Sequence, residues 1–148
     1  MSCSTGLLRY WYITIVLITV SINASYAAEV KDAPLLIPGT NKVFAEDLLD
    51  LAEKIPNLLI IDARIRSDRK QGYIEGSISL PDIETNCASL AKVIPQKTAP
   101  VLFYCNGVKC GRSVTSSKIA LKCGYHNIYW FRGGFEEWKT KHLPFIKK

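Results

Sequence analysis

The sequence predicts an α/β domain built around a mainly parallel sheet. Short apolar runs, which are typical of buried strands, alternate along the chain with amphipathic stretches that are typical of helices. Two of the runs, residues 58–61 and 101–104, are apolar throughout, which indicates strands that are covered on both faces. With 148 residues the chain is long enough for one domain with its own core. We therefore expect a single α/β domain over residues 40–148.

The first half of this domain begins with a short edge strand at residues 42–44. A helix at 45–54 follows, because acidic residues stand in its first turn and its leucines recur at helical spacing. Pro56 ends this helix before the apolar strand at 58–61. The remaining elements of this half are a short polar helix or loop at 65–71, a strand at 77–80 that Pro81 ends, and an amphipathic helix at 85–93.

The second half repeats the pattern of strand and helix. The apolar strand at 101–104 leads through a polar loop into a helix at 114–123, and Gly124 follows that helix as glycine commonly does. A last strand at 127–131 and a glycine turn precede a terminal helix at 135–141. Five strands in total are therefore expected, with helices between them.

The N-terminal segment has the features of a secretory signal peptide. Residues 10–28 carry no charge, and their apolar core at 11–22 is shorter than the ~20 residues that a spanning helix needs. Small residues precede the expected cleavage site, so residues 1–27 are interpreted as a leader and 28–39 as a lead-in segment. The mature protein is then periplasmic or secreted. An uncleaved anchor in the inner membrane, facing the periplasm, remains as the alternative, and only then do we expect membrane contact.

The charge and the cysteines of the chain limit the partners, cofactors and disulfides that we expect. The net charge of +6 is spread along the chain rather than gathered in a run, and no RNA-binding or zinc-finger motif appears. We therefore expect no nucleic acid, no metal and no cofactor. Removal of the leader leaves four cysteines, which allow up to two disulfides and three pairings in an oxidising compartment: Cys87, Cys105, Cys110 and Cys123. That pairing competes with a free reactive Cys105, and the sequence leaves both open.

The candidate catalytic residue is Cys105, which follows the strand at 101–104 directly. Its loop is basic and contains glycine, and a helix begins behind it, so loop N–H groups, a helix N-terminus and nearby cations are expected to favour a thiolate. Arg112 is expected to bind an oxyanion through two donors. The predicted substrate-binding residues are Asn106, Gly107, Val108, Lys109, Cys110, Gly111 and Arg112.

Asp62 and Arg64 follow the other fully apolar strand. In a parallel sheet the carboxyl ends of the strands share one edge, where active sites lie. An Asp and an Arg at such a position commonly form an ion pair that fixes a loop. We therefore expect these two residues to give structural support rather than to act on a substrate.

Five short motifs occur together in a characteristic order. They are IDAR at 61–64, GYIEGS at 72–77, FYC at 103–105, GRS at 111–113 and RGGFEEW at 132–138. In this order they resemble a single-domain rhodanese, and the resemblance covers nearly the whole mature chain. It implies a three-layer α/β fold with a five-stranded sheet and a sulfurtransferase activity. It also implies that Cys105 takes a sulfane sulfur from thiosulfate or a similar small anionic donor as a persulfide. Cyanide, a thiol or a partner protein would then accept that sulfur.

The loop departs from the family pattern in two ways that bear on function. Arg112 follows Cys105 after two more residues than is usual in the family, so the anion that the loop accepts is left open. Cys110 lies inside the loop and is a candidate resolving cysteine for a persulfide or sulfenate. Two alternatives therefore stand beside the sulfurtransferase: a thiol–disulfide redox protein that uses Cys105 and Cys110, and a non-catalytic binding module with the same fold.

Overall fold

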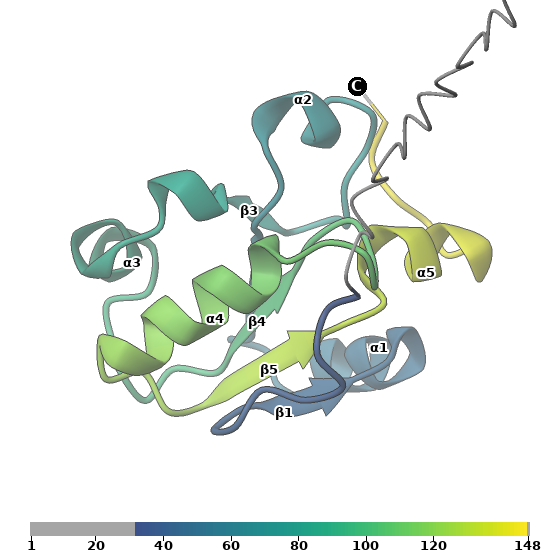
Figure 1. Cartoon of the computed structure of the whole chain (residues 1–148). Helices are drawn as coiled ribbons and strands as arrows, with labels where there is room; N and C mark the ends of the chain where they lie inside the picture. The colour runs from purple at the N-terminus through teal and green to yellow at the C-terminus, as the bar shows by residue number, and fades with distance from the viewer. Residues whose placement is uncertain (1–31, 148) are drawn as a thin grey trace, which may run out of the picture.

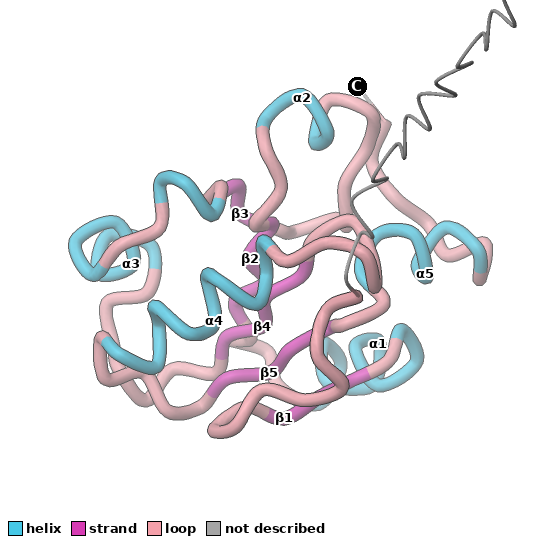
Figure 2. The backbone as a smooth tube through the Cα atoms, in the orientation of Figure 1, coloured by secondary structure: helices cyan, strands magenta, loops and turns pink. Residues whose placement is uncertain are grey.

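The computed structural model describes residues 32–147, and the leader expected at residues 1–27 lies outside them. The described part is a three-layer α/β domain with a five-stranded parallel sheet, as the sequence predicts (Figures 1 and 2). The strands are β1 (Asn41–Val43), β2 (Leu59–Asp62), β3 (Ile78–Ser79), β4 (Val101–Tyr104) and β5 (Ile128–Phe131). The helices are α1 (Ala45–Lys54), α2 (Arg66–Arg69), α3 (Cys87–Val93), α4 (Arg112–Lys122) and α5 (Gly134–Thr140), with a short 3₁₀ helix η1 (Asp82–Glu84) before α3.

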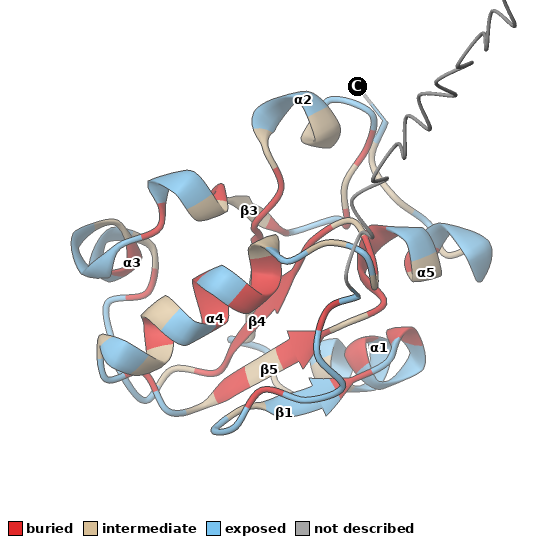
Figure 3. Ribbon diagram, in the orientation of Figure 1, coloured by how far each residue is buried: buried red, intermediate tan, exposed pale blue. Residues whose placement is uncertain are grey.

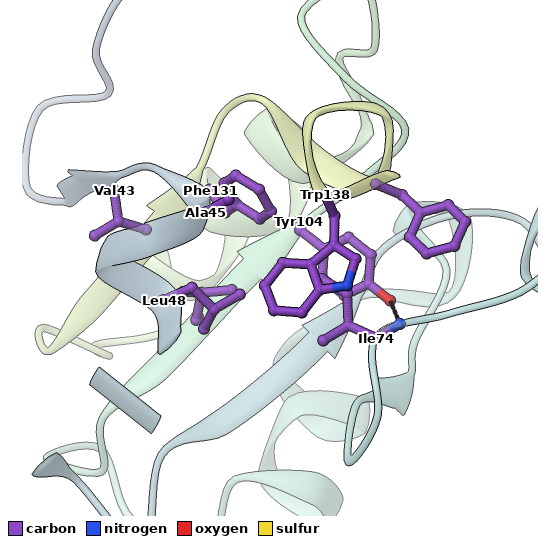
Figure 4. Packing of buried hydrophobic residues seen from close by; sticks show 9 residues of the cluster. Val43, Ala45, Leu48, Ile74, Tyr104, Phe131 and Trp138 are labelled. Atoms are coloured by element: carbon purple, nitrogen blue, oxygen red, sulfur yellow. Dashed lines mark hydrogen bonds between the residues drawn. The ribbon is translucent and has the colours of Figure 1, made fainter. Parts of the chain in front are cut away.

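Strand β4 lies at the centre of the sheet, whose order is β1-β5-β4-β2-β3. All four of its residues are buried, because successive side chains point to opposite faces and both faces are covered (Figure 3). Leu102 and Tyr104 pack in the core on the side of α1 and α5, whereas Val101 and Phe103 pack in the core on the side of α3 and α4. Figure 4 shows Tyr104 among its neighbours in the first of these cores. The uninterrupted apolar run is therefore explained by burial on both sides.

The element boundaries differ from the prediction by one or two residues in most cases. Helix α3 begins at Cys87 because the side chain of Asn86 accepts hydrogen bonds from the backbone N–H groups of Ala88 and Ser89, each at 3.0 Å. Helix α4 begins at Arg112, two residues earlier than predicted. The 3₁₀ helix η1 was not predicted.

The described part of the lead-in segment packs onto the domain. Ala33 and Ile37 are buried against Val114 and Trp130. The guanidinium of Arg132 donates to the backbone carbonyls of Pro34 and Ala33, at 2.8 Å each. This segment therefore belongs to the folded body, and its contacts reach α4 and the end of β5. Within residues 32–147 no helix is both long and apolar enough to cross a membrane.

A disulfide joins Cys87 of α3 to Cys123 at the end of α4. The two Cα atoms are 5.4 Å apart, within the range that a disulfide spans without backbone movement. Cys105 and Cys110 are both free. Of the pairings left open by the sequence, the structure thus has one bridge between helices and leaves two thiols in the same loop.

Candidate active site

Cys105 is fixed at the carboxyl end of β4 by a chain of hydrogen bonds. Its Sγ atom lies 3.1 Å from Ser113 Oγ and 3.2 Å from the backbone carbonyl oxygen of Cys110, to which the thiol donates. Ser113 Oγ in turn accepts a hydrogen bond from the indole N–H of Trp130 at 3.0 Å. Only 1% of Cys105 is exposed. The residue is therefore enclosed between the sheet, its own loop and the first turn of α4.

Cys110, whose carbonyl oxygen contacts Cys105, is only partly buried. It lines a pocket of about 520 Å³ at the carboxyl edge of the sheet. The other lining residues are Asp82, Asn106, Lys109, Gly111, Arg112, Thr115 and Glu136. Cys105 does not line this pocket. A small molecule that enters the pocket therefore meets the sulfur of Cys110 rather than that of Cys105.

The surroundings of the two thiols favour a thiolate at Cys110 over one at Cys105. The neighbouring Cys105 side chain, the backbone N–H groups of Arg112 and Asn106, and the charge of Arg112 together lower the pKa of Cys110 to about 6, against the opposing effect of burial. The interaction with Cys110 and then burial raise the pKa of Cys105. The expectation that Cys105 itself carries a lowered pKa is therefore wrong for this arrangement. The loop N–H groups point at the second cysteine instead.

Arg112 is held between two carboxylates at one side of the pocket. Its Nη1 atom is 3.1 Å from Asp68 Oδ2, and its Nε atom is 3.7 Å from Asp82 Oδ1. The same Asp68 oxygen accepts a hydrogen bond from Asn106 Nδ2 at 2.8 Å. An incoming anion would compete with Asp68 and Asp82 for the guanidinium. The pocket also contains Glu136, so it is of mixed charge rather than the purely basic cradle that the sequence indicates.

Gly107 and Val108 do not line the pocket, although the sequence assigns them to substrate binding. The carbonyl of Val108 accepts a hydrogen bond from the N–H of Ala33 at 2.6 Å, which directs this part of the loop towards the lead-in segment. Gly107 lies against the side chain of Glu136, which would have to move aside for a Cβ atom at this position. Neither Gly107 nor Gly111 has a positive φ angle, so the conformational freedom expected of them is not what this loop uses.

Asp62 and Arg64 form a buried ion pair outside the pocket that Cys110 lines. Arg64 Nη2 is 2.7 Å from Asp62 Oδ2, and the hydroxyl of Tyr104 donates to the same carboxylate oxygen at 2.8 Å. Arg69 of α2 adds a second cation, with its Nη1 atom 2.9 Å from Asp62 Oδ2. Burial, and then the charge of Asp62, raise the pKa of Tyr104. The cluster joins the ends of β2 and β4 to α2.

Several residues around the pocket were not among the predicted site residues. Asp68 comes from α2, Asp82 from η1, Glu136 from α5, and Ser113 and Thr115 from the first turn of α4. Asp82 follows β3 at the same sheet edge as Cys105, which is a signal that the sequence contains. Asp68 reaches the site only through the path of the segment after β2, which the sequence does not reveal. Among the residues that the structure describes, no group of three or more His, Cys, Asp or Glu side chains is placed to hold a metal ion.

Comparison with known proteins identifies the class to which this fold and site belong. Residues 44–141 match the rhodanese-like domain family, so the chain belongs to that family. A rhodanese domain-containing protein of Drosophila melanogaster, CG4456, is 29% identical over 97 residues, which are 58% of this chain and 86% of that protein.

Solved structures share the fold at lower identity. A thiosulfate sulfurtransferase from Pseudomonas aeruginosa superposes with a TM-score of 0.62 at 23% identity, over 73% of this chain and 20% of that one. The polysulfide-sulfur transferase homodimer of Wolinella succinogenes gives a TM-score of 0.61 at 22% identity, over 74% of this chain and 80% of that one. The rhodanese fold predicted from the motifs is thereby confirmed.

Proposed function

We propose that this protein is an exported sulfurtransferase. It takes a sulfane sulfur from thiosulfate or a similar small anionic donor, carries it as a persulfide on Cys105, and passes it to cyanide or to a thiol acceptor, which includes a thiol on a partner protein. The observation that carries the proposal is the position of Cys105 at the end of the central strand β4 and beside the first turn of α4 in a rhodanese-like domain. The thiosulfate and polysulfide transferases that share the fold support the same class of reaction.

The reaction has two stages. A thiolate attacks the outer sulfur of the donor, a sulfur–sulfur bond forms, and sulfite leaves with the electron pair of the bond that breaks. The persulfide is then attacked at its outer sulfur by the acceptor, which restores the thiolate. Ser113 Oγ, 3.1 Å from Cys105 Sγ, is placed to donate a hydrogen bond to the sulfur that becomes anionic.

The test of the proposal is turnover with the simplest substrates. We expect the purified protein to release sulfite from thiosulfate and to form thiocyanate when cyanide is added. Cys105→Ser should lose thiocyanate formation, whereas Lys118→Ala, on the exposed side of α4, should retain it. Failure of the wild-type protein to turn over either thiosulfate or a polysulfide would contradict the proposal.

Arg112 gives a sharper test of how the donor is recognised. Loss of its guanidinium removes a charged donor from the pocket and a positive charge near Cys110. We expect Arg112→Ala to reduce kcat/KM for thiosulfate. The expected reduction corresponds to a loss of roughly 1–3 kcal/mol of transition-state stabilisation. Steady-state kinetics with Lys118→Ala as the matched control measure this effect. Unchanged kinetics in Arg112→Ala would show that Asp68 and Asp82 keep the guanidinium from the donor.

Export of the mature protein belongs to the same proposal. The Cys87–Cys123 disulfide supports an oxidising compartment, because structural disulfides are rare in the reducing cytosol. The leader proposed at residues 1–27 would direct the chain there. Fractionation of cells that express the full chain, with N-terminal sequencing of the product, distinguishes a cleaved periplasmic protein from an anchored one.

A thiol–disulfide redox protein is the second candidate function. The observation that favours it is the contact between the two free cysteines, since Cys105 Sγ lies 3.2 Å from the carbonyl oxygen of Cys110 in the same loop. This function predicts a reversible disulfide within the loop and loss of activity in either single cysteine variant. A Cys105–Cys110 disulfide that forms readily, in a protein that takes up no sulfur after reduction, would favour it over sulfur transfer.

A further inference from the structure

The sulfur that meets the pocket is not the sulfur that the family pattern marks as the carrier. Cys105 is 1% exposed and its Sγ atom is enclosed by Ser113 Oγ and the carbonyl oxygen of Cys110. Cys110 is partly exposed and lines the 520 Å³ pocket together with Lys109 and Arg112. A donor that enters this pocket therefore approaches Cys110 first.

We infer that Cys110 takes the sulfane sulfur from the donor and hands it to Cys105, so that the loop works as a two-cysteine sulfur relay. This inference rests on the proposed sulfur transfer and assigns its first step to a residue that the family pattern does not mark. The acceptor then removes the sulfur from Cys105.

The electrostatics of the loop support this order of events. The backbone N–H groups of Asn106 and Arg112 and the charge of Arg112 stabilise a thiolate at Cys110, whereas the Cys105 thiol donates a hydrogen bond to a carbonyl oxygen and stays protonated. Only a thiolate attacks the donor at a useful rate. A thiol of low pKa is also a good leaving group in sulfur exchange. Cys110 is therefore suited both to receive the sulfur and to release it to its neighbour.

Each step of the relay balances in atoms and charge. The Cys110 thiolate attacks the outer sulfur of thiosulfate, a new S–S bond forms, and the original S–S bond breaks with release of sulfite. The Cys110 persulfide anion then takes the proton of the Cys105 thiol. The resulting Cys105 thiolate attacks the outer sulfur, which bonds to Cys105 while the Cys110 thiolate leaves. No external oxidant or reductant is consumed.

The geometry also explains how a buried cysteine delivers the sulfur. A persulfide lengthens the Cys105 side chain by one S–S bond of about 2 Å. The side of Cys105 on which Cys110 lies leads to the pocket, since Cys110 contacts both Cys105 and the pocket space. In the relay, the outer sulfur of a Cys105 persulfide therefore points towards Cys110 and the pocket from which it came.

The relay is tested by single-turnover sulfur uptake with the Cys87–Cys123 disulfide intact. The wild-type protein, Cys105→Ser, Cys110→Ser and the control Lys118→Ala are mixed with thiosulfate without oxygen and quenched with an alkylating reagent. Intact mass and peptide mapping then locate the added sulfur. We expect Cys105→Ser to gain one sulfur, on Cys110, more slowly than the wild type at neutral pH because loss of the interaction with Cys105 raises the pKa of Cys110, and at close to the wild-type rate at alkaline pH. Uptake in Cys110→Ser should be slower by on the order of tenfold or more, since an ordinary thiol is only a few per cent thiolate at pH 7.

Three results would overturn the relay. The first is uptake at the wild-type rate in Cys110→Ser together with none in Cys105→Ser, which leaves Cys105 as the sole sulfur-handling residue and the proposed function intact. The second is conversion of the wild-type persulfide into a Cys105–Cys110 disulfide with release of hydrosulfide, which makes the second cysteine a resolving thiol. The third is absence of uptake in every protein with both thiosulfate and a polysulfide, which removes the proposed function as well.

Discussion

At the scale of single residues, the loop after β4 contains two thiols in unequal surroundings. The Cys105 thiol donates to the carbonyl oxygen of Cys110 at 3.2 Å, a contact that favours the protonated form. Backbone N–H groups donate hydrogen bonds to the Cys110 side chain, and the positive charge of Arg112 acts on it; both favour the thiolate. The same seven-residue loop thus favours a protonated thiol at the buried Cys105 and a thiolate at Cys110 beside the pocket.

This difference predicts a pH dependence of alkylation. Because the pKa of Cys110 is lowered to about 6, its thiolate forms as the pH rises through that value and is lost as the pH falls below it. We expect the rate of iodoacetamide labelling at Cys110 to rise through about pH 6 and to level off near neutrality. Peptide mapping after short labelling pulses between acidic and alkaline pH measures the midpoint.

The matched variant for this experiment is Cys105→Ser. The interaction with the Cys105 side chain is the largest cause of the lowered pKa of Cys110. If that cause is removed or weakened, the labelling midpoint of Cys110 should move up towards the ~8.5 of an ordinary thiol. A wild-type midpoint that already lies at the ordinary value would show that the loop does not stabilise the Cys110 thiolate.

At the scale of elements, the first turn of α5 holds the backbone of the cysteine loop. The N–H of Phe135 donates to the carbonyl of Cys105 at 2.9 Å, and the N–H of Glu136 donates to the carbonyl of Asn106 at 2.7 Å. Gly134 precedes these donors with a φ angle of 58°, in the left-handed region that favours glycine. A Cβ atom there would lie 2.3 Å from the carbonyl oxygen of Cys105.

Gly134→Ala is therefore expected to act on both stability and the site. We expect it to lower the free energy of unfolding by roughly 2–4 kcal/mol, of which about 1–2 kcal/mol reflects the left-handed φ angle and the rest the displaced backbone. Urea unfolding measures the loss, and thiosulfate turnover should fall in the protein that remains folded.

Gly124→Ala is the control for the backbone angle alone. Gly124 has a φ angle of 87° but no heavy atom within 4 Å of a Cβ position. The free energy of unfolding of Gly124→Ala should fall only by the cost of the left-handed φ angle, about 1–2 kcal/mol, and the variant should keep full turnover. Equal losses of stability in the two variants, with turnover retained in both, would contradict the role of Gly134 in holding the loop.

The elements themselves were largely predictable from the sequence. The range 101–104 is a strand as predicted, and 45–54 is a helix as predicted, because apolar runs and helical periodicity report burial directly. The exposure of Cys105 relative to Cys110 was not predictable in the same way. It depends on contacts of the loop with Ala33 and Glu136, which are distant in sequence and leave no local pattern.

At the scale of the whole molecule, two sets of long-range interactions stabilise the edge of the sheet where the pocket lies. The buried carboxylate of Asp62 binds Arg64, Arg69 and Tyr104, which ties β2, α2 and β4 together. Removal of one partner of such a buried pair is costly because it leaves the other charge uncompensated. The sequence placed Asp62 at the end of a strand but did not reveal that Arg69 and Tyr104 also bind it.

The second of these interactions is the Cys87–Cys123 disulfide, which joins α3 to α4 across 36 residues of sequence. Helix α4 starts at Arg112 and presents Ser113 to Cys105, so the bridge anchors the far end of the helix that supports the site. We expect replacement of both bridging cysteines by serine to lower the free energy of unfolding by roughly 2–4 kcal/mol, since a loop of this length then regains its freedom in the unfolded chain. Urea unfolding without reductant measures the difference.

Reductant separates this effect from a simple loss of packing. A thiol reductant that opens the bridge should lower the stability of the wild-type protein to nearly that of the double serine variant and leave the variant unchanged. Sulfur uptake should survive in the variant below its unfolding midpoint, because Cys105 and Cys110 are not part of the bridge. Equal stability of the two proteins without reductant would contradict a stabilising bridge. It would also remove the structural argument for an oxidising compartment.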